Sequence, residues 1–500
     1  MGLAKMKLFK FRGGVHPTEN KQATAGSKIS TVPLADRLFI PLQQHIGAPA
    51  EPIIKRGDKV VKGQLLANSQ GVISAPVHAP SSGKIIAIGK YPAPHPSGLP
   101  VRTIIMEPDG EERWADISVP YDDPFSLAPE EISAHVAAAG IVGMGGATFP
   151  SAVKLNLRKR YHLDQLIINA AECEPYLTCD DQLMREQASD IIAGIRIMMH
   201  ALQVKKSIVA IEANKPEAIK AMQVASQVNT EISIITVPVR YPMGSEKHLL
   251  QALTGMETPA RALTADIGIV VHNVATAYAI QQCIYHGRPL IDRVVTLSGG
   301  AMKKPGNYLT PIGTPVSALL EFAEGFTEEP ACIIGGGPMM GQVLPDTRVP
   351  IVKGSGGILA FTKKEMAPQQ SMPCIRCGSC VTVCPCGLLP LEMVNRARND
   401  DLDGAVKFGL IDCIACGSCA YVCPSHIPLL QYFNFAKGAL TEKLRAQHKQ
   451  EETRRLAEAR TIRMEAQAKV RREAMAKRKA EKAAKQALQA EQEIKAEARA

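Results

Sequence analysis

Eight cysteines in two matching runs are the residues of this chain whose chemistry is most directly inferred. One run begins at Cys374 and reads C-I-R-C-G-S-C-V-T-V-C-P, and the other begins at Cys413 and reads C-I-A-C-G-S-C-A-Y-V-C-P. Thiolates spaced as C-x2-C-x2-C-x3-C-P bind two [4Fe–4S] clusters, because three cysteines of a run bind one cluster and the fourth binds the other. The predicted ligands are Cys374, Cys377, Cys380 and Cys423 for cluster 1, and Cys413, Cys416, Cys419 and Cys384 for cluster 2. The pattern therefore predicts the transfer of single electrons.

The alternative for these cysteines is structural zinc, which also favours C-x2-C pairs. Zinc takes four ligands per site and has no use for the third cysteine of each run or for the final Cys-Pro, so the iron–sulfur interpretation is preferred. Gly378 and Gly417 occupy the same place in the two runs. We expect them to let the backbone bend around each cluster and to direct amides at its sulfurs.

A glycine-rich loop, Gly140–Lys154, reads G-I-V-G-M-G-G-A-T-F-P-S-A-V-K. It departs from the dinucleotide fingerprint G-x-G-x-x-G because Thr148 occupies the last position. Two interpretations are open, a backbone cradle for a phosphate ahead of a helix or a packing turn. The next loop, Asn169–Asp181, holds four acidic residues after a predicted strand. It is either a solvated loop that caps a helix or part of a binding site.

Length, charge and cysteine use limit the class of protein. The chain has 500 residues, which predicts several domains. Of its net charge of +10, most lies in residues 440–500, with seventeen Lys and Arg against ten Asp and Glu. With one Trp and few aromatics, nucleic-acid binding is disfavoured. The other five cysteines suggest no disulfide framework, which indicates a reducing, cytoplasmic compartment. No uninterrupted apolar run of about 18 residues occurs, so a membrane role is expected only through partners.

The segments that must position these residues alternate in type. Short apolar pieces between Gly turns follow Ile53 and predict a small barrel. They resemble the barrel-sandwich domains of biotinyl and lipoyl carriers, in which a modifiable Lys occupies the hairpin tip. His78 is found there instead and is expected to be a surface turn residue. Residues 91–125 are Pro-rich and are expected to form a connection. Beyond Pro129, strands and helices alternate, which predicts an α/β domain around a mostly parallel sheet with ligands at the strand ends.

The paired cysteine runs, the start F-R-G-G-V-H-P, the glycine loop and the sequence N-A-A-E-C-E-P together resemble the RnfC (RsxC) family. This resemblance covers about residues 6–435. It implies a peripheral subunit on the cytoplasmic face of the bacterial inner membrane, within an ion-translocating complex. Its partners would be the other subunits of that complex, NADH and ferredoxin-type carriers. The implied class is an oxidoreductase of the translocase type.

The middle of the chain is similar to the FMN- and NADH-binding subunit of respiratory complex I. That likeness implies flavin contacts, with Lys154 facing the phosphate. The implied cofactor-binding residues are Gly143, Gly145, Gly146, Phe149, Lys154, Asn169, Glu172, Glu174, Glu246, Asn273 and Thr276. Met144, Ala171 and Ser245 replace an Arg, an Asp and a Glu of the family pattern. The resemblance therefore implies an FMN pocket kept in outline and fewer nicotinamide contacts.

The resemblance also assigns a multidomain α/β architecture. The predicted units are an N-terminal extension (1–29), a barrel-sandwich hybrid (30–125), a Rossmann-like α/β domain for FMN and NADH (126–290), a β-grasp domain like the soluble-ligand-binding SLBB domain (291–365), an α-helical dicluster ferredoxin domain (366–435) and an Ala/Lys/Glu-rich helical or disordered tail (436–500).

The expected function is electron transfer between NADH and ferredoxin-type carriers, coupled to ion movement. A hydride brings two electrons and a cluster accepts one, so FMN would convert one flow into the other. We expect no general acid–base residue, with Glu172 and Glu174 orienting the nucleotide. The alternatives are a docking scaffold with an empty nucleotide pocket and a freestanding soluble NADH dehydrogenase.

Overall fold

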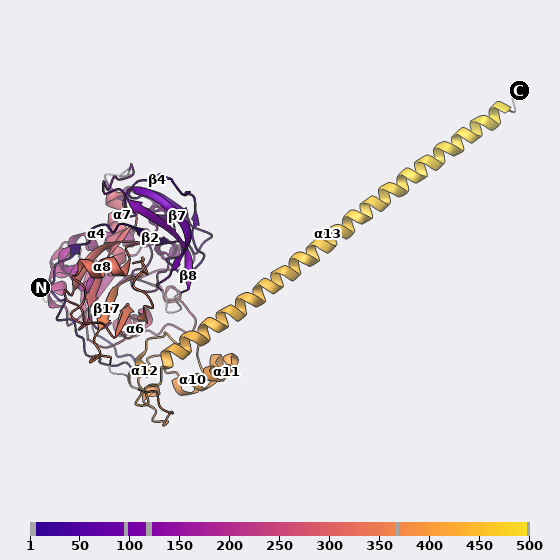
Figure 1. Cartoon of the computed structure of the whole chain (residues 1–500). Helices are drawn as coiled ribbons and strands as arrows, with labels where there is room; N and C mark the ends of the chain where they lie inside the picture. The colour runs from indigo at the N-terminus through magenta and orange to yellow at the C-terminus, as the bar shows by residue number, and fades with distance from the viewer. Residues whose placement is uncertain (1–6, 95–98, 117–122, 367–369, 498–500) are drawn as a thin grey trace.

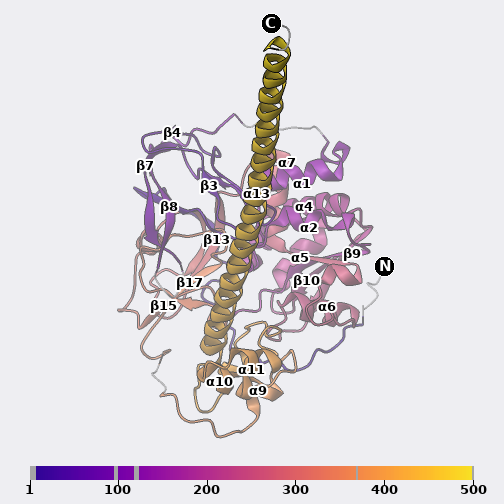
Figure 2. The same ribbon diagram turned by 90° about the vertical axis from the view of Figure 1, so that its right-hand side faces the viewer.

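The computed structural model describes residues 7–94, 99–116, 123–366 and 370–497. Four sheets and their helices pack into one body, from which a single long helix projects (Figure 1). The helical domain that holds the cysteine runs lies at the base of that helix (Figure 2). The multidomain α/β architecture expected from the sequence is confirmed.

Two antiparallel sheets form the barrel near the N-terminus. Strands β2 (Leu38–Pro41), β8 (Pro100–Pro108), β7 (Gly83–Pro92) and β4 (Lys59–Val60) make one sheet, and β3 (Glu51–Pro52), β5 (Leu65–Asn68) and β6 (Val77–His78) make the other. Leu38, Ile85 and Ile104 are fully buried between them. Two expectations are wrong here. His78 is buried in β6, because this hairpin packs against other domains, and residues 100–108 pair along β7 instead of forming a connection.

The α/β domain is built on a parallel sheet in the order β11-β10-β9-β12, as the sequence predicts. Its strands are β9 (Gln165–Ala170), β10 (Lys206–Glu212), β11 (Ile232–Val237) and β12 (Ile269–Asn273). Its helices are α1 (Pro129–Ala138), α2 (Ser151–Leu155), α3 (Cys179–Glu186), α4 (Ala188–Leu202), α5 (Pro216–Ala225), α6 (Glu246–Thr254) and α7 (Val274–His286), with 3-10 turns at Pro124–Ser126, Leu157–Lys159 and Thr264–Ile267. Ile168 faces α4 and α7, whereas its neighbour Ile167 faces α6. Both faces are therefore buried, which explains the continuous apolar runs.

A mixed six-stranded sheet follows in sequence and packs beside the α/β domain. Its order is β1 (Ser30–Thr31), β14 (Gly306–Pro311), β13 (Asp292–Ser298), β17 (Gly357–Phe361), β15 (Cys332–Gly335) and β16 (Gln342–Val343). Helix α8 (Val316–Phe322) contributes Leu319 and Leu320 to its core. The predicted strand–turn–strand–helix unit of residues 294–324 is thus present.

An extended N-terminal strap, residues 9–31, joins three of these units. Val15 exchanges two backbone hydrogen bonds with Tyr241 of the α/β domain, at 2.8 and 2.9 Å. The amide of Gly14 donates to Val383 in the first cysteine run at 2.8 Å. Ser30 then pairs with Tyr308 in the six-stranded sheet. The strap therefore ties the cysteine-rich domain to the body of the protein.

The cysteine-rich domain is helical, as its charged spacer predicts. Its helices are α9 (Ser379–Thr382), α10 (Pro390–Arg398), α11 (Leu402–Lys407), α12 (Ser418–Tyr421) and the start of α13 (Leu429–Glu497). Met393, Leu410 and Phe433 form the small core between them.

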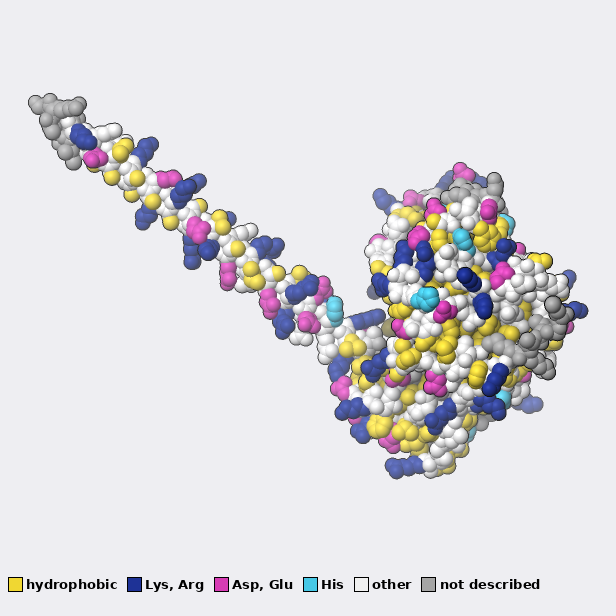
Figure 3. Space-filling model, turned by 180° about the vertical axis from the view of Figure 1, so that it is seen from behind, with side chains coloured by type: hydrophobic (Ala, Val, Ile, Leu, Met, Phe, Trp, Pro, Cys, Tyr) yellow, Lys and Arg dark blue, Asp and Glu magenta, His cyan; other side chains and the backbone are white. Residues whose placement is uncertain are grey.

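Helix α13 runs on for 69 residues, so the helical alternative for the tail holds over its described part. Its apolar side chains are exposed beyond the domain, for example Val470 at 65%. On the face seen in Figure 3, Lys and Arg side chains are spread along the length of the helix. Among the described residues, no helix combines the length and the apolar character that crossing a bilayer requires.

Candidate functional site

The two cysteine runs fold as a structural repeat. Gly378 and Gly417 have φ angles of 79° and 76° and precede the short helices α9 and α12. A side chain is strained in this left-handed region, so the predicted bend at both glycines is present. In each run, the amide two residues after the first cysteine donates to the sulfur of that cysteine. These bonds run from Arg376 to Cys374 and from Ala415 to Cys413, both at 3.4 Å.

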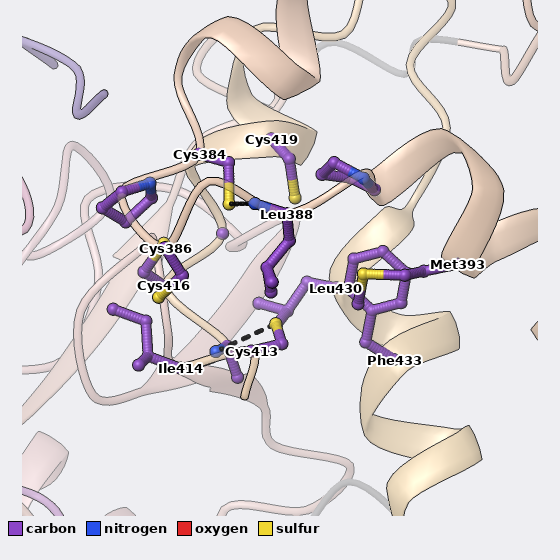
Figure 4. A pocket seen from close by; sticks show the side chains of 14 residues that line it. Cys384, Cys386, Leu388, Met393, Cys413, Ile414, Cys416, Cys419, Leu430 and Phe433 are labelled. Atoms are coloured by element: carbon purple, nitrogen blue, oxygen red, sulfur yellow. Dashed lines mark hydrogen bonds between the residues drawn. The ribbon is translucent and has the colours of Figure 1, made fainter. Parts of the chain in front are cut away.

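The four cysteines predicted for cluster 2 line one small cavity. The side chains of Cys384, Cys413, Cys416 and Cys419 lie around the same space, among apolar residues such as Leu388 (Figure 4). The amide of Leu388 donates to the sulfur of Cys384 at 3.3 Å. Four thiolates from two runs around one apolar space are the donor set that a [4Fe–4S] cluster needs, so these residues fit the group.

A fifth cysteine, Cys386, also lines this cavity, two residues beyond Cys384. The cysteine spacing did not predict that Cys386 lies here, because Cys386 follows the Cys-Pro that ends the first run.

The four cysteines predicted for cluster 1 lie in a more open setting. Cys374 and Cys377 are exposed, and Cys380 and Cys423 are half-buried. The two predicted clusters thus differ in solvent access, one of the factors that set cluster potentials.

A cavity of about 640 Å³ lies where the α/β domain, the six-stranded sheet and the second cysteine run meet. Its size is in the range of small-molecule sites. Of the predicted flavin residues, the following line it: Gly145, Gly146, Asn169, Glu172, Glu174 and Asn273. The others lie outside its lining: Gly143, Phe149, Lys154, Glu246 and Thr276.

The glycine loop forms one wall of this cavity. Gly146 has a φ of 103°, and a Cβ built on it meets no protein atom within 4 Å. A Cβ on Gly145 would approach that of Asn273 to 3.2 Å. The loop is held from behind, because the amide of Met144 donates to the Thr276 hydroxyl at 3.0 Å. Glycines leave room here for a flat ligand beside backbone amides, so the cradle interpretation fits the geometry.

Asn169 lies at the end of strand β9 and holds the opposite wall. Its side-chain amide donates to the carbonyl of Gly244 at 2.8 Å. Asn273, at the end of β12, accepts from the amide of Ala275 at 2.9 Å and so caps helix α7. Both asparagines thus stand at the carboxyl ends of parallel strands, where α/β proteins bind ligands.

Glu172 is buried and caps helix α3. Its carboxylate accepts from the amides of Asp180 at 2.9 Å and Asp181 at 3.4 Å, and from the thiol of Cys179 at 3.3 Å. Lys21 of the N-terminal strap donates to the Glu172 carbonyl at 2.6 Å. The acidic loop therefore caps a helix, as one interpretation holds, but it is buried against the strap instead of solvated.

Glu174 closes the cavity on the side of a second glycine tract, residues 335–341, which reads G-G-G-P-M-M-G. Its carboxylate accepts from the amides of Met339 and Met340, both at 3.0 Å, and lies 3.3 Å from the hydroxyl of Tyr241. Burial raises the pKa of Glu174 to about 7, against these hydrogen bonds, which favour the ionised form. This carboxyl group can therefore gain or lose a proton near neutral pH.

Lys154 and Glu246 form an ion pair behind the glycine loop. Their charged atoms are 2.9 Å apart, and Lys154 also donates to the Val271 carbonyl at 2.9 Å. Phe149 shapes the same loop through its carbonyl, which accepts from the amide of Gly143 at 2.8 Å. These residues support the cavity without lining it.

Tyr241 is a site residue that motif comparison missed. It is 2% exposed, and its hydroxyl donates to the carbonyl of Cys416 at 2.7 Å. Cys416 lines both the small cysteine cavity and the large cavity. The flavin residues and the cluster 2 residues thus share a wall. In the sequence, Tyr241 could have been noticed as the aromatic residue of Y-P-M-G-S-E, a loop that leads into a helix.

Family models match four parts of the chain. They are the RnfC barrel sandwich hybrid domain over residues 9–111, the Nuo51 FMN-binding domain over 136–282, the SLBB domain over 294–343 and the 4Fe-4S dicluster domain over 373–427. The predicted FMN and [4Fe–4S] cofactors are confirmed at the level of these domains.

Two relatives match nearly the whole chain. The C subunit of the ion-translocating oxidoreductase complex of Rhodobacter capsulatus is 56% identical over 444 residues, which cover 89% of this chain and 85% of the relative. The C subunit of the proton-translocating ferredoxin:NAD(+) oxidoreductase complex of Clostridium ljungdahlii is 45% identical over 433 residues, or 86% and 94% of the two chains.

Among solved structures, an NAD+-reducing [NiFe]-hydrogenase in its H2-reduced state aligns over 59% of this chain and 56% of that one. The TM-score is 0.44 at 19% identity, so this likeness is weak. The two bacterial relatives and the RnfC barrel model agree with each other and span most of the sequence. The chain therefore belongs to the RnfC family, the C subunits of ion-translocating oxidoreductase complexes, as an electron-transfer subunit with an FMN-binding domain and a 4Fe-4S dicluster domain.

Proposed function

We propose that this subunit moves electrons between NADH and a ferredoxin-type carrier through FMN in the 640 Å³ cavity and two [4Fe–4S] clusters in the cysteine-rich domain. The relative from Clostridium ljungdahlii carries ferredoxin, NAD+ and proton translocation in its name. The proposed location is the cytoplasmic face of the inner membrane, held there by other subunits of the complex.

We further propose the ligand sets predicted from spacing. Cluster 1 would be held by Cys374, Cys377, Cys380 and Cys423, and cluster 2 by Cys413, Cys416, Cys419 and Cys384. The arrangement of the second set around one apolar cavity supports this assignment. When bound, FMN exchanges electron pairs with a nicotinamide and single electrons with iron–sulfur clusters.

Residues of the chain would hold FMN between two glycine-rich segments. Gly145 and Gly146 offer a surface free of side chains, and Asn273 begins helix α7 beside them. Glu174 fixes the second glycine tract and presents a carboxyl group that titrates near neutral pH. Tyr241 closes the cavity on the side of the second cysteine run, against which it is buried.

The observation that carries the proposal is that Cys416 lines both cavities. Cluster 2 would then be the neighbour of the flavin. Cluster 1, with its exposed Cys374 and Cys377, would face the redox partner. The differing exposure of the two cysteine sets supports this order.

The test is the content of iron, acid-labile sulfide and FMN per chain after anaerobic purification, followed by bleaching with NADH. We expect about eight iron atoms and one FMN per chain, and loss of flavin and cluster absorbance on adding NADH. Zinc in place of iron, or protein without flavin that stays unchanged with NADH, would exclude the proposal.

A further inference from the structure

A second cavity adjoins the flavin cavity, and one arginine lines both. The second cavity, of about 620 Å³, is bounded by the barrel, the α/β domain and the six-stranded sheet. The two cavities share Met144, Cys179, Asp180 and Arg293. Arg293 comes from strand β13, so the six-stranded sheet supplies a cation to a cavity that this sheet and the α/β domain line together.

Arg293 is buried without a carboxylate partner. Only 3% of the residue is exposed, and its guanidinium donates from Nη1 to the Lys353 carbonyl at 2.5 Å and from Nε to the Val294 carbonyl at 3.4 Å. Among the described residues, its guanidinium forms no ion pair with a carboxylate, although the side chain of Cys179 is a further hydrogen-bond partner. Burial lowers the pKa of Arg293, the mark of a charge removed from water. A buried charge of this kind is costly unless a partner neutralises it.

One neighbouring carboxylate, that of Asp180, attracts the charge of Arg293 without forming an ion pair with it. Asp180 shares both cavity walls with Arg293, and its Oδ2 accepts from the Asn273 side chain at 2.7 Å. Burial and the nearby charge of Glu172 raise the pKa of Asp180, which disfavours its ionised form. An anionic ligand in the cavity would supply the direct ion pair that Asp180 does not make with Arg293.

The surroundings of Arg293 suit a phosphate. Helix α7 has 13 residues and begins at the cavity wall with Asn273 as its N-cap, and Gly145 lies against the same asparagine. Helix N-termini and free amides favour anions, and a guanidinium binds two phosphate oxygens at once. Arg293 is the one Lys or Arg among the described residues that line the flavin cavity, since Lys154 is paired with Glu246 outside it.

We propose that Arg293 binds the phosphate of the nucleotide held in the flavin cavity. The inference rests on the proposed function, and it reassigns the phosphate-binding cation from Lys154 to a residue of the six-stranded sheet. The phosphate is either the monophosphate of FMN or the pyrophosphate of NADH. Loss of Arg293 would weaken FMN binding in the first case and NADH binding in the second.

The experiment compares Arg293→Met, Arg293→Lys, Lys154→Met and Arg288→Met in the full-length protein with its clusters. Arg288 lines only the second cavity, where it stacks on Trp114, and so serves as the matched control. Flavin is removed, and the dissociation constants of FMN and of riboflavin, which lacks the phosphate, are measured by flavin fluorescence. NADH affinity is then measured on FMN-loaded protein, with iron content as the check on folding.

For R293M we expect the preference for FMN over riboflavin to fall by about tenfold or more, since hydrogen bonds between charged groups are the strong ones. Riboflavin affinity should change little, R293K should fall between R293M and the wild type, and K154M and R288M should keep the preference. If R293M keeps the preference for FMN over riboflavin but loses NADH affinity by a similar factor, Arg293 binds the pyrophosphate of NADH instead.

Loss of neither affinity in R293M overturns the inference while the proposed function stands. Wild-type protein that binds neither flavin overturns the proposed function itself. If R293M lacks iron, R293K decides, because it keeps the buried charge and removes only the forked geometry. Full FMN preference and full NADH affinity in R293K together with loss in K154M would return the role to Lys154.

Discussion

The hydroxyl of Tyr241 donates a 2.7 Å hydrogen bond to the backbone carbonyl of Cys416. The same hydroxyl lies 3.3 Å from Glu174, which holds the second glycine tract. One buried side chain thus connects the wall of the proposed flavin cavity to a proposed ligand of cluster 2. The packing of the two redox sites against each other depends on this contact and on the N-terminal strap that pairs with Tyr241.

Replacing Tyr241 with Phe should disturb cluster 2 without emptying the flavin cavity. The carbonyl of Cys416 loses its donor, which costs about 1 kcal/mol and loosens the second cysteine run. We expect FMN content to stay constant, while the paramagnetic spectrum of one reduced cluster changes and NADH-driven cluster reduction slows. Tyr421→Phe, at a residue of the cysteine-rich domain that is 53% exposed, is the control. Identical spectra for Y241F and the wild type would contradict the prediction.

Adding a methyl group to Gly146 should lower flavin content selectively. The substitution G146A places a Cβ at a φ of 103° on the cavity wall, where it meets no protein atom and so occupies ligand space. Backbone strain of about 1–2 kcal/mol accompanies any side chain in this region. Gly110→Ala, with a φ of 77° and no neighbour within 4 Å, carries similar strain away from the cavity. The measure is the FMN-to-iron ratio, which should fall in G146A only, and an equal fall in G110A would refute the cavity-wall explanation.

The stability of the protein should decline as pH rises toward neutrality, in part through Glu174. Burial raises its pKa from an ordinary 4.5 to about 7, so between these values the folded chain retains a proton that the unfolded chain has lost. Stability from this group is complete at low pH and is lost as pH rises through about 7.

Glu174→Gln removes this titration and keeps an acceptor for one of the two amides, which bond to different oxygens of Glu174. The difference in thermal midpoint between E174Q and the wild type should therefore shift in favour of the variant from pH 5 to pH 8. Glu51→Gln, at an exposed carboxyl group that pairs with Arg102, is the control for the Glu-to-Gln change itself. Parallel curves for E174Q and the wild type would show that Glu174 ionises as an ordinary carboxyl group.

Cys416 and Cys386 provide a paired test of the ligand assignment. Cys416→Ala should reduce iron from about eight atoms per chain to about four, because one cluster loses a ligand. Cys386→Ala, in the same cavity wall but outside the predicted set, should keep both clusters. The measurement is iron and sulfide per chain, and a loss of iron in C386A equal to that in C416A would require a different ligand set.

Removing the outer part of helix α13 should leave the redox domain intact. Residues 449–493 are all exposed, so truncation after His448 should change neither the cofactor content nor the thermal midpoint by much, as is usual for surface changes. Truncation after Ala436 also removes Lys437, whose ammonium donates to the carbonyl of Cys413. The shorter chain should lose iron. Retention of full iron content after both truncations would show that the Lys437 contact is dispensable.

Much of this fold could be predicted from local sequence because local physics determines it. The alternation of Ile167 and Ile168 between two buried faces, and the left-handed glycines Gly378 and Gly417, follow from periodicity and backbone sterics. The burial of His78 could not be predicted in this way, since it depends on domains that pack against the barrel.

The residues of the candidate site fall into the same two groups, those determined by local sequence and those determined by packing between domains. Glycines and strand-end asparagines were found by motif because their role is local. Lys154 was expected to face a phosphate, but it lies against Glu246, and Arg293 enters the cavity from a strand about 140 residues away in sequence. No motif in the flavin domain could have indicated a residue supplied by another sheet.

The N-terminal strap has a consequence for how the chain is made. Residues 9–31 are synthesised early, yet Gly14 bonds to Val383 and Ser30 pairs with Tyr308, which are synthesised hundreds of residues later. Contacts between residues so distant in sequence form slowly, whereas domains otherwise fold in order of synthesis. This early segment therefore docks late, so assembly of the two redox sites waits until translation has passed both cysteine runs.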